Sequence, residues 1–341
     1  MNNLTLFLMV ALTACTPKVE LTHLEGFAQG TTYHISFYLK DTSKVPAIEM
    51  EINNELNRLD AAISNYRDDS AIEKFNAQRT TEPQEISEEI VQLIEVARHI
   101  SDASRGCYDL TITPLFELWG FKKDTFSLPD ETTLKETLSL VGMKKLETID
   151  STHLRKSLPN LRIDLSSIGQ GYSVGRLAHI LEAHHIENYL VEIGGELKTR
   201  GKKPDGKRWR IALEKPLPNE RQLEKIVVFN SGEPMSLMTS GTYRHYFDNN
   251  GKRYSHILDA RSGKPVEHTT VSVTVAHPDP TLADAWSTAL LCLGREAGTP
   301  IANMNGIAAL YIEQVDGSLV ETNTLPLDKL AGIVFEPAHT E

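Results

Sequence analysis

Strand-like runs alternate with helical segments through the second half of the chain, and this pattern constrains the fold more than any other feature. Two helical segments, 172–184 and 281–294, stand among the runs. The runs lie at 161–165, 188–201, 208–213, 224–229, 270–277 and 307–314. No internal repeat or linker divides the series. The pattern predicts one α+β domain with mixed or antiparallel sheets and packed helices.

The first half is richer in helices. One strand is expected at 31–39, where β-forming residues alternate with polar ones. Helix 46–63 has apolar residues at helical spacing, and further helices are expected at 85–104 and 128–142. Asp130 is the predicted N-cap of the last of these.

Charge excludes one class of function. The 341 residues carry a formal net charge of -11, and no basic run stands out. Nucleic-acid binding needs a cationic face, so it is not expected. A chain with 40% hydrophobic residues is long enough to bury a stable core.

The N-terminus reads as a bacterial lipoprotein signal. An apolar run at 4–12 is too short to span a bilayer and leads into "LTAC", which resembles a lipobox ending at Cys15. Residues 1–3 lack the usual Lys or Arg, and an ordinary secretory signal or a chance apolar start are the alternatives. We therefore expect a signal at 1–15 with lipidation at Cys15, a tether at 16–22 and a folded domain at 23–338.

Two other cysteines remain, Cys107 and Cys292. They could pair in an oxidising compartment, although a single pair at this separation is a weak signal. Cys292 lies in an apolar helical run, which favours a small core residue. No zinc-binding spacing is present.

Three stretches could carry chemistry. In "DLSSIGQGYSVGRLA" (164–178), a strand leads through small residues into a helix. Such a loop offers backbone N–H groups to an anion, and Gly169 and Gly171 allow a ligand to approach closely. The stretch is neither a Walker A loop nor a GxGxxG fingerprint, and a structural turn is the alternative.

The second stretch is "LADAWSTALLCLG" (282–294). Asp284 and Thr288 share one helix face, with Ser287 beside them. Oxygen ligands of this kind suit Mg²⁺. The alternative is that Asp284 is a solvated acid in the first helical turn.

The third stretch is "YSHILDARSGKPV" (254–266). His256 can exchange a proton near neutral pH, and Asp259 could either orient it or initiate the turn. A lone histidine in a strand is more often structural. The three stretches together nevertheless describe phosphoryl or nucleotidyl transfer.

From about Gly26 to Phe335 the chain resembles the ApbE family of FAD:protein FMN transferases. The resemblance rests on "QGTTY", "SNYRDDSAIEKFN", "GCYDLTITPLFELWGF", "VEIGGELKTRG", "SLMTSGTYRHYF" and the three stretches above. It implies that FMN is esterified from FAD to a Thr or Ser hydroxyl of a partner protein, with AMP as the leaving group and Mg²⁺ as the cofactor.

The resemblance also implies roles for single residues. His256 would be the base, and Mg²⁺ would lie between the carbonyl of Ser167 and the side chains of Asp284, Thr288 and Ser287. Flavin contacts would come from Gln29, Tyr66, Cys107, Tyr108, Asp109, Asp164, Gln170 and Leu258. Many family members have Lys in place of Gln170 and Met in place of Gln29, so these flavin contacts differ here.

Two other functions fit the same residues. Water could replace the acceptor hydroxyl, which would make the protein a Mg²⁺-dependent FAD pyrophosphatase that yields FMN and AMP. A non-catalytic FAD-binding lipoprotein is the other alternative, although such a protein has little need for Asp284 and Thr288. For the transferase, the resemblance implies acceptor subunits of membrane redox complexes, such as a Na⁺-pumping NADH:quinone reductase. It also implies a lipid anchor on the periplasmic side of a bacterial membrane; the family favours the inner membrane, and the outer membrane is the alternative.

Overall fold

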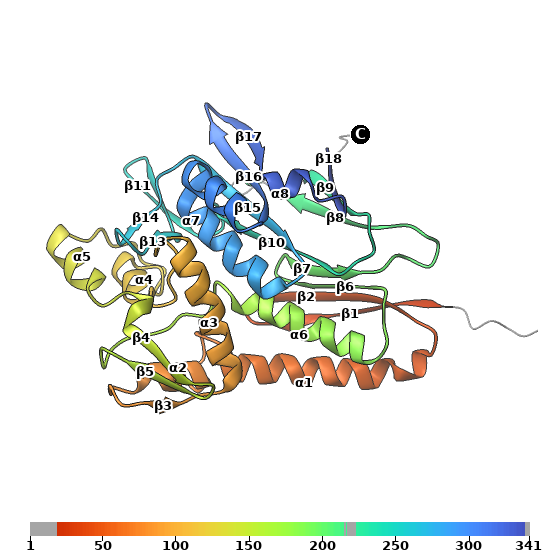
Figure 1. Ribbon diagram of the computed structural model, residues 1–341, viewed down its shortest axis with the longest axis horizontal. Helices are drawn as coiled ribbons and strands as arrows, with labels where there is room; N and C mark the ends of the chain where they lie inside the picture. The colour runs from red at the N-terminus through yellow and green to blue at the C-terminus, as the bar shows by residue number, and fades with distance from the viewer. Residues whose placement is uncertain (1–18, 215, 217–222, 338–341) are drawn as a thin grey trace, which may run out of the picture.

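One large antiparallel sheet organises the molecule (Figure 1). The computed structural model describes residues 19–214, 216 and 223–337. The strand order is β1-β2-β6-β7-β10-β15-β16-β17, and every neighbouring pair is antiparallel. The strands are β1 (Glu20–Ala28), β2 (Thr31–Leu39), β6 (Tyr189–Ile193), β7 (Glu196–Arg200), β10 (Met235–Gly241), β15 (Thr270–His277), β16 (Ala308–Val315) and β17 (Ser318–Asn323).

Helices cover one face of this sheet. Two of them lie directly on the central strands, and the other two pack against these helices, one of them also against the edge strand β1 (Figure 1). The inner pair is α6 (Gly169–Ala183) and α7 (Pro280–Met304), and the outer pair is α1 (Val45–Ile63) and α3 (Glu88–Ala103). Met238 and Tyr311 point into the core between the helices and the sheet.

A second, smaller sheet covers the opposite face. Its order is β18-β9-β8, from β8 (Trp209–Glu214), β9 (Leu223–Phe229) and β18 (Ile333–Pro337). Leu237 and Leu310 lie in the core between the two sheets. They directly precede Met238 and Tyr311, which lie in the core on the helix side. Successive side chains of a strand point to opposite faces, so the central strands are buried on both sides.

Among the remaining elements, α4, α5 and the β13–β14 hairpin pack together at one end of the sheet, while α8 packs on β16 and η1 directly precedes α1. The remaining elements are η1 (Thr42–Lys44), α2 (Ala71–Ala77), β3 (Gln84–Glu85), α4 (Thr113–Trp119), α5 (Glu131–Leu138), η2 (Met143–Lys145), β4 (Leu146–Asp150), β5 (His153–Lys156), β11 (Tyr246–Asn249), β12 (Lys252–Ser255), β13 (Leu258–Asp259), β14 (Lys264–Pro265) and α8 (Leu325–Asp328).

The predicted α+β class is confirmed, and the three helices predicted in the first half are α1, α3 and α5. Asp130 caps α5, because its carboxylate accepts hydrogen bonds from the N–H groups of Thr132 and Thr133, each at 2.9 Å. The helix is shorter than predicted and ends at Leu138.

The strand predicted at 161–165 is wrong. Asn76 accepts a hydrogen bond from the N–H of Ile163 at 2.7 Å and donates to its carbonyl at 2.8 Å. Asn65 accepts from the N–H of Leu165 at 2.6 Å. Two asparagine side chains therefore supply the partners that a neighbouring strand would supply.

The N-terminal region is described only in part. The predicted signal with Cys15 lies outside the described residues, as do residues 16–18 of the predicted tether. β1 begins inside that tether, because Glu20 already pairs with Leu39. Among the described residues, no helix is both long and apolar enough to cross a membrane.

Candidate active site

His256 lies between β12 and β13, at the wall of a cavity of about 200 Å³. Its ring Nδ1 is 2.8 Å from the main-chain carbonyl oxygen of His245, which can only accept a hydrogen bond. Nδ1 therefore carries the proton of the neutral ring, and Nε2 keeps a lone pair. The same carbonyl accepts from the main-chain N–H of His256 at 3.0 Å, so one residue fixes both the backbone and the ring.

The surroundings keep this ring neutral. Burial lowers the pKa of His256 to about 4, although its hydrogen bond to His245 opposes that shift. Electrostatic interactions with the His245 ring and with Arg244 lower the pKa as well. A neutral imidazole with a free Nε2 can accept a proton from a hydroxyl at physiological pH.

Asp259 initiates a turn. Its carboxylate accepts from the N–H of Arg261 at 2.9 Å and pairs with the Arg261 guanidinium at 2.8 Å. Its carbonyl accepts from the N–H of Gly263, whose φ of 72° favours glycine. Of the two roles considered from the sequence, the structure shows turn formation, and the His245 carbonyl orients His256 instead.

The oxygen atoms expected to hold Mg²⁺ come from α7 and from the loop that precedes α6. Asp284 and Thr288 of α7 line the His256 cavity, and so does Ser167. Asp284 is buried, and its Oδ2 accepts from the N–H of Gly171 at 2.8 Å. The predicted loop glycines are therefore already in the first turn of α6, which begins at Gly169.

Gly171 allows the two helices to meet at this point. A Cβ at this position would lie 2.3 Å from the Pro280 carbonyl oxygen and 2.5 Å from the Cβ of Asp284. No real side chain fits at such distances. The close approach brings the start of α6 against the carboxylate of α7.

Ser287 lies apart from the other three oxygen donors. It is fully buried, its hydroxyl donates to the Asp284 carbonyl at 2.8 Å, and it lies 2.7 Å from the Ser240 hydroxyl. The cavity lining does not include it. Its contacts join α7 to β10.

The donor set fits a hard cation. Asp284, Thr288 and Ser167 offer only oxygen to the cavity, which is the chemistry that Mg²⁺ prefers. Burial raises the pKa of Asp284 to about 7. Burial, followed by the charge of Asp284, raises the pKa of Glu196. Two buried carboxylates that repel each other would be stabilised by a divalent cation.

Most residues expected to contact flavin line the same cavity. They are Cys107, Tyr108, Asp109, Asp164, Gln170 and Leu258. The Tyr108 hydroxyl accepts a hydrogen bond from the Ser167 hydroxyl at 3.1 Å. This bond joins the loop of residues 107–109 to one of the residues expected to hold Mg²⁺. Both oxygens of Asp109 bond to main-chain N–H groups, at 2.7 Å to Thr111 and 2.8 Å to Met143. Asp109 therefore holds its own loop in shape.

The other expected contacts line an adjoining cavity of about 450 Å³. Gln29 and Tyr66 lie there, and Ser166 and Gln170 line both cavities. The Gln29 amide donates to the Ser173 hydroxyl at 2.6 Å, and its buried Oε1 has no partner within the described residues. Tyr66 is 84% exposed, with Lys122 5.3 Å from the ring centroid. An exposed ring at a cavity can stack on a flat ligand.

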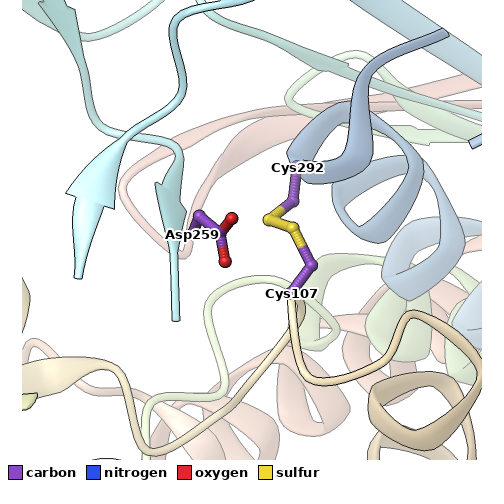
Figure 2. A group of neighbouring side chains, drawn as sticks. All are labelled: Cys107, Asp259 and Cys292. Carbon is purple, nitrogen blue, oxygen red and sulfur yellow. A yellow bond between two sulfur atoms is a disulfide. The ribbon is translucent and has the colours of Figure 1, made fainter. Parts of the chain in front are cut away.

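A disulfide joins Cys107 to Cys292 beside Asp259 (Figure 2). The sequence left open whether these two cysteines pair. The structure shows that they do, although they are 185 residues apart in sequence. Cys292 lies one helical turn beyond Thr288 on α7, and Cys107 immediately precedes Tyr108. The disulfide therefore joins α7, which carries Asp284 and Thr288, to the 107–109 loop, where flavin contacts are expected.

Two charged residues of the cavity escaped the sequence analysis. Glu196 is buried at the start of β7 and accepts from the N–H of Thr239 at 3.1 Å. Arg244 lies between β10 and β11 at the rim. The only signal for Glu196 was a carboxylate directly after the paired glycines of "VEIGGELKTRG".

Comparisons with known proteins show the family of the chain. The model of the ApbE family matches residues 29–311. The chain is 36% identical to the FAD:protein FMN transferase of Haemophilus influenzae, over 94% of each chain. It superposes on the flavin transferase ApbE of Vibrio cholerae with a TM-score of 0.82 and 33% identity, over 92% of this chain and 99% of the other. For the apo flavinyl transferase ApbE of Pseudomonas stutzeri, the TM-score is 0.83 at 36% identity, over 92% and 98%.

Proposed function

The chain belongs to the ApbE family and is a flavin transferase, and we propose that it moves FMN from FAD to a threonine or serine hydroxyl of a partner protein, with release of AMP. One observation carries the finer part of this proposal. A neutral histidine with a free Nε2 shares a cavity with the oxygen atoms of Asp284, Thr288 and Ser167.

The proposed reaction is a displacement at phosphorus. The acceptor oxygen forms a bond to the FMN phosphorus, and the bond from that phosphorus to the bridging oxygen of the pyrophosphate breaks. The hydroxyl proton passes to Nε2 of His256, and AMP leaves with the bridging oxygen. A positioned base of this kind contributes about a hundredfold to ten-thousandfold to a rate.

Mg²⁺ is part of the proposal because the site fits it. Asp284, Thr288 and the carbonyl of Ser167 would hold the ion. Ser287 would not bind it, but would fix α7 through its hydrogen bonds to the Asp284 carbonyl and Ser240. When bound, Mg²⁺ neutralises charge on the pyrophosphate and on the leaving phosphate.

The two adjoining cavities provide room for an extended dinucleotide. Gln170 and Ser166 lie at their junction, so one ligand can contact both. Tyr66 offers a stacking surface in the second cavity, while Tyr108, Asp109 and Leu258 line the first. This arrangement supports FAD as the substrate.

A place outside the cytoplasm is also proposed. The disulfide is typical of an oxidising compartment, which agrees with a lipoprotein signal ending at Cys15. Acyl chains on Cys15 would tether the enzyme to the periplasmic side of a membrane. Subunits of membrane redox complexes, such as a Na⁺-pumping NADH:quinone reductase, would then be within reach as acceptors.

The test follows flavin onto protein. The chain without residues 1–15 is incubated with FAD, Mg²⁺ and a purified acceptor subunit, and the products are separated on a denaturing gel. Flavin fluorescence that stays with the acceptor band, and disappears when EDTA is added, is the expected result.

The same reaction distinguishes the alternatives. Rapid formation of AMP and free FMN without fluorescence on any of several acceptors would replace the transferase with an FAD pyrophosphatase. Intact FAD that remains bound without turnover would replace it with a flavin-binding protein.

A further inference from the structure

The catalytic cavity is acidic, and one cation stands at its rim. Four carboxylates line it: Asp109, Asp164, Glu196 and Asp284. Among the described residues of the lining, Arg244 is the only Lys or Arg. A ligand that carries phosphate groups would meet strong repulsion in such a cavity without cationic partners.

Arg244 is held in place by a glycine turn. Its Nη1 donates to the carbonyl of Gly194 at 3.4 Å. A Cβ at Gly195 would lie 3.2 Å from its Nη2, and the φ of 98° at Gly195 also favours glycine. Because Gly195 has no side chain, the guanidinium can lie close to the backbone of the β6–β7 turn.

Most of the hydrogen-bonding capacity of Arg244 is unused. The guanidinium has five N–H donors, and the described residues provide one long hydrogen bond and no ion pair. By contrast, Arg253, in the hairpin that follows, pairs with Asp248 and stacks on Tyr246. Within the described residues, Arg244 therefore keeps N–H donors for a ligand, whereas Arg253 already has protein partners.

The charge of Arg244 acts on the reacting groups. Arg244 lines the same cavity as His256 and Glu196. Its charge adds to the lowering of the His256 pKa, which is mainly due to burial, and opposes the rise of the Glu196 pKa that burial causes. In the proposed reaction the acceptor oxygen gives its proton to His256 while it bonds to the FMN phosphorus. The phosphate next to His256 is therefore the one that belongs to FMN.

We propose that Arg244 is a phosphate-binding residue of this site and that it holds the FMN phosphate during transfer. This inference rests on the proposed function. A planar guanidinium can give two parallel hydrogen bonds to one phosphate, and this geometry suits the equatorial oxygens of a phosphoryl group in transfer.

The test separates the phosphate from the ring system. Arg244→Gln, Arg244→Lys and the control Arg253→Gln are titrated with FAD, FMN and riboflavin in EDTA, with quenching of flavin fluorescence as the readout. Riboflavin has the flavin ring but no phosphate. For Arg244→Gln we expect the affinity for FMN and FAD to fall about tenfold to a hundredfold, and that for riboflavin to change less than about threefold.

The other two variants sharpen the result. Arg244→Lys should recover part of the affinity for FMN, because it keeps the charge and loses the planar fork. Arg253→Gln should bind all three ligands like the parent chain. An equal loss for FMN and riboflavin in Arg244→Gln, or no loss for either, would overturn the inference. The titrations need neither acceptor nor turnover, so a failed transfer assay leaves their outcome unaffected.

Discussion

At the scale of single residues, a main-chain carbonyl decides what His256 can do. The carbonyl of His245 holds the proton on Nδ1 and leaves Nε2 as the acceptor. His256→Gln keeps a polar side chain of similar reach but removes the proton acceptor. We expect transfer to slow by about a hundredfold or more, with FAD affinity within about threefold. Single-turnover kinetics and a flavin titration measure the two effects, and an unchanged rate would contradict the role of His256.

The pH dependence follows from the same residue. Its pKa is lowered to about 4, so the neutral, proton-accepting form dominates above about pH 5. At saturating Mg²⁺, the rate should hold from about pH 8 to 6 and fall only as the pH approaches 4. An ordinary histidine would lose half of its activity near pH 6.5. A half-maximal rate there, in single-turnover transfer, would show that the pKa of the base is not lowered.

Sequence reasoning reached the reactive residues because their chemical types stand out. His256, Asp284 and Thr288 are brought together in one cavity. Glu196 and Arg244 were missed because their significance lies in the tertiary structure. The charge of Glu196 interacts with that of Asp284 in one cavity, and Arg244 bonds to the carbonyl of Gly194. The role of Asp259 could not be decided either, because the Arg261 side chain can pair with it only once the turn has formed.

At the scale of elements, the site depends on the contact between α6 and α7. Gly171→Ala would put a methyl group against the Pro280 carbonyl and the Asp284 side chain. The two helices must then separate, which we expect to cost about 1–3 kcal/mol of unfolding free energy and to weaken Mg²⁺-dependent FAD binding. Denaturant unfolding and FAD titration with and without Mg²⁺ are the measurements.

Gly175→Ala, one turn further along α6, is the matched control. Its Cβ would meet only the ring of Pro280, with the nearest atom at 3.0 Å. It should cost less stability and leave FAD binding intact. Equal effects of the two substitutions would show that the contact at Asp284 has no special importance.

The disulfide between Cys107 and Cys292 is the second connection between elements on which the site depends. The double substitution Cys107→Ala and Cys292→Ala releases a closed loop of 185 residues. We expect a loss of about 2–5 kcal/mol of unfolding free energy and weaker FAD binding, because α7 and the 107–109 loop are no longer joined. A dithiol reductant should destabilise the parent chain by a similar amount and leave the double variant unchanged. If the reductant affects both equally, the bond is not responsible.

Helices were easier to predict than irregular segments. Apolar residues at helical spacing mark α1 and α3, and tertiary packing does not alter that period. The segment 161–165 has the composition of a strand, yet its backbone bonds to Asn65 and Asn76. Those asparagines lie far earlier in the chain, so no local pattern could reveal them.

At the scale of the whole molecule, the sheet brings distant segments to one site. The walls of the catalytic cavity come from the 107–109 loop, the start of α6, β7, β10 and α7. The α+β class followed from the sequence pattern, while the domain bounds of 23–338 stay a prediction. Strand order and the second sheet on the opposite face depend on long-range pairing, which composition and periodicity do not specify.

The most direct test of the central claim is a mass spectrum of the acceptor. The acceptor subunit is incubated with FAD, Mg²⁺ and either the parent chain or His256→Gln, and its peptides are then fragmented. The account predicts one FMN joined through its phosphate to a threonine or serine with the parent chain, in step with AMP release, and far less with the variant. An unmodified acceptor beside free FMN and AMP, or equal modification by both proteins, would contradict it.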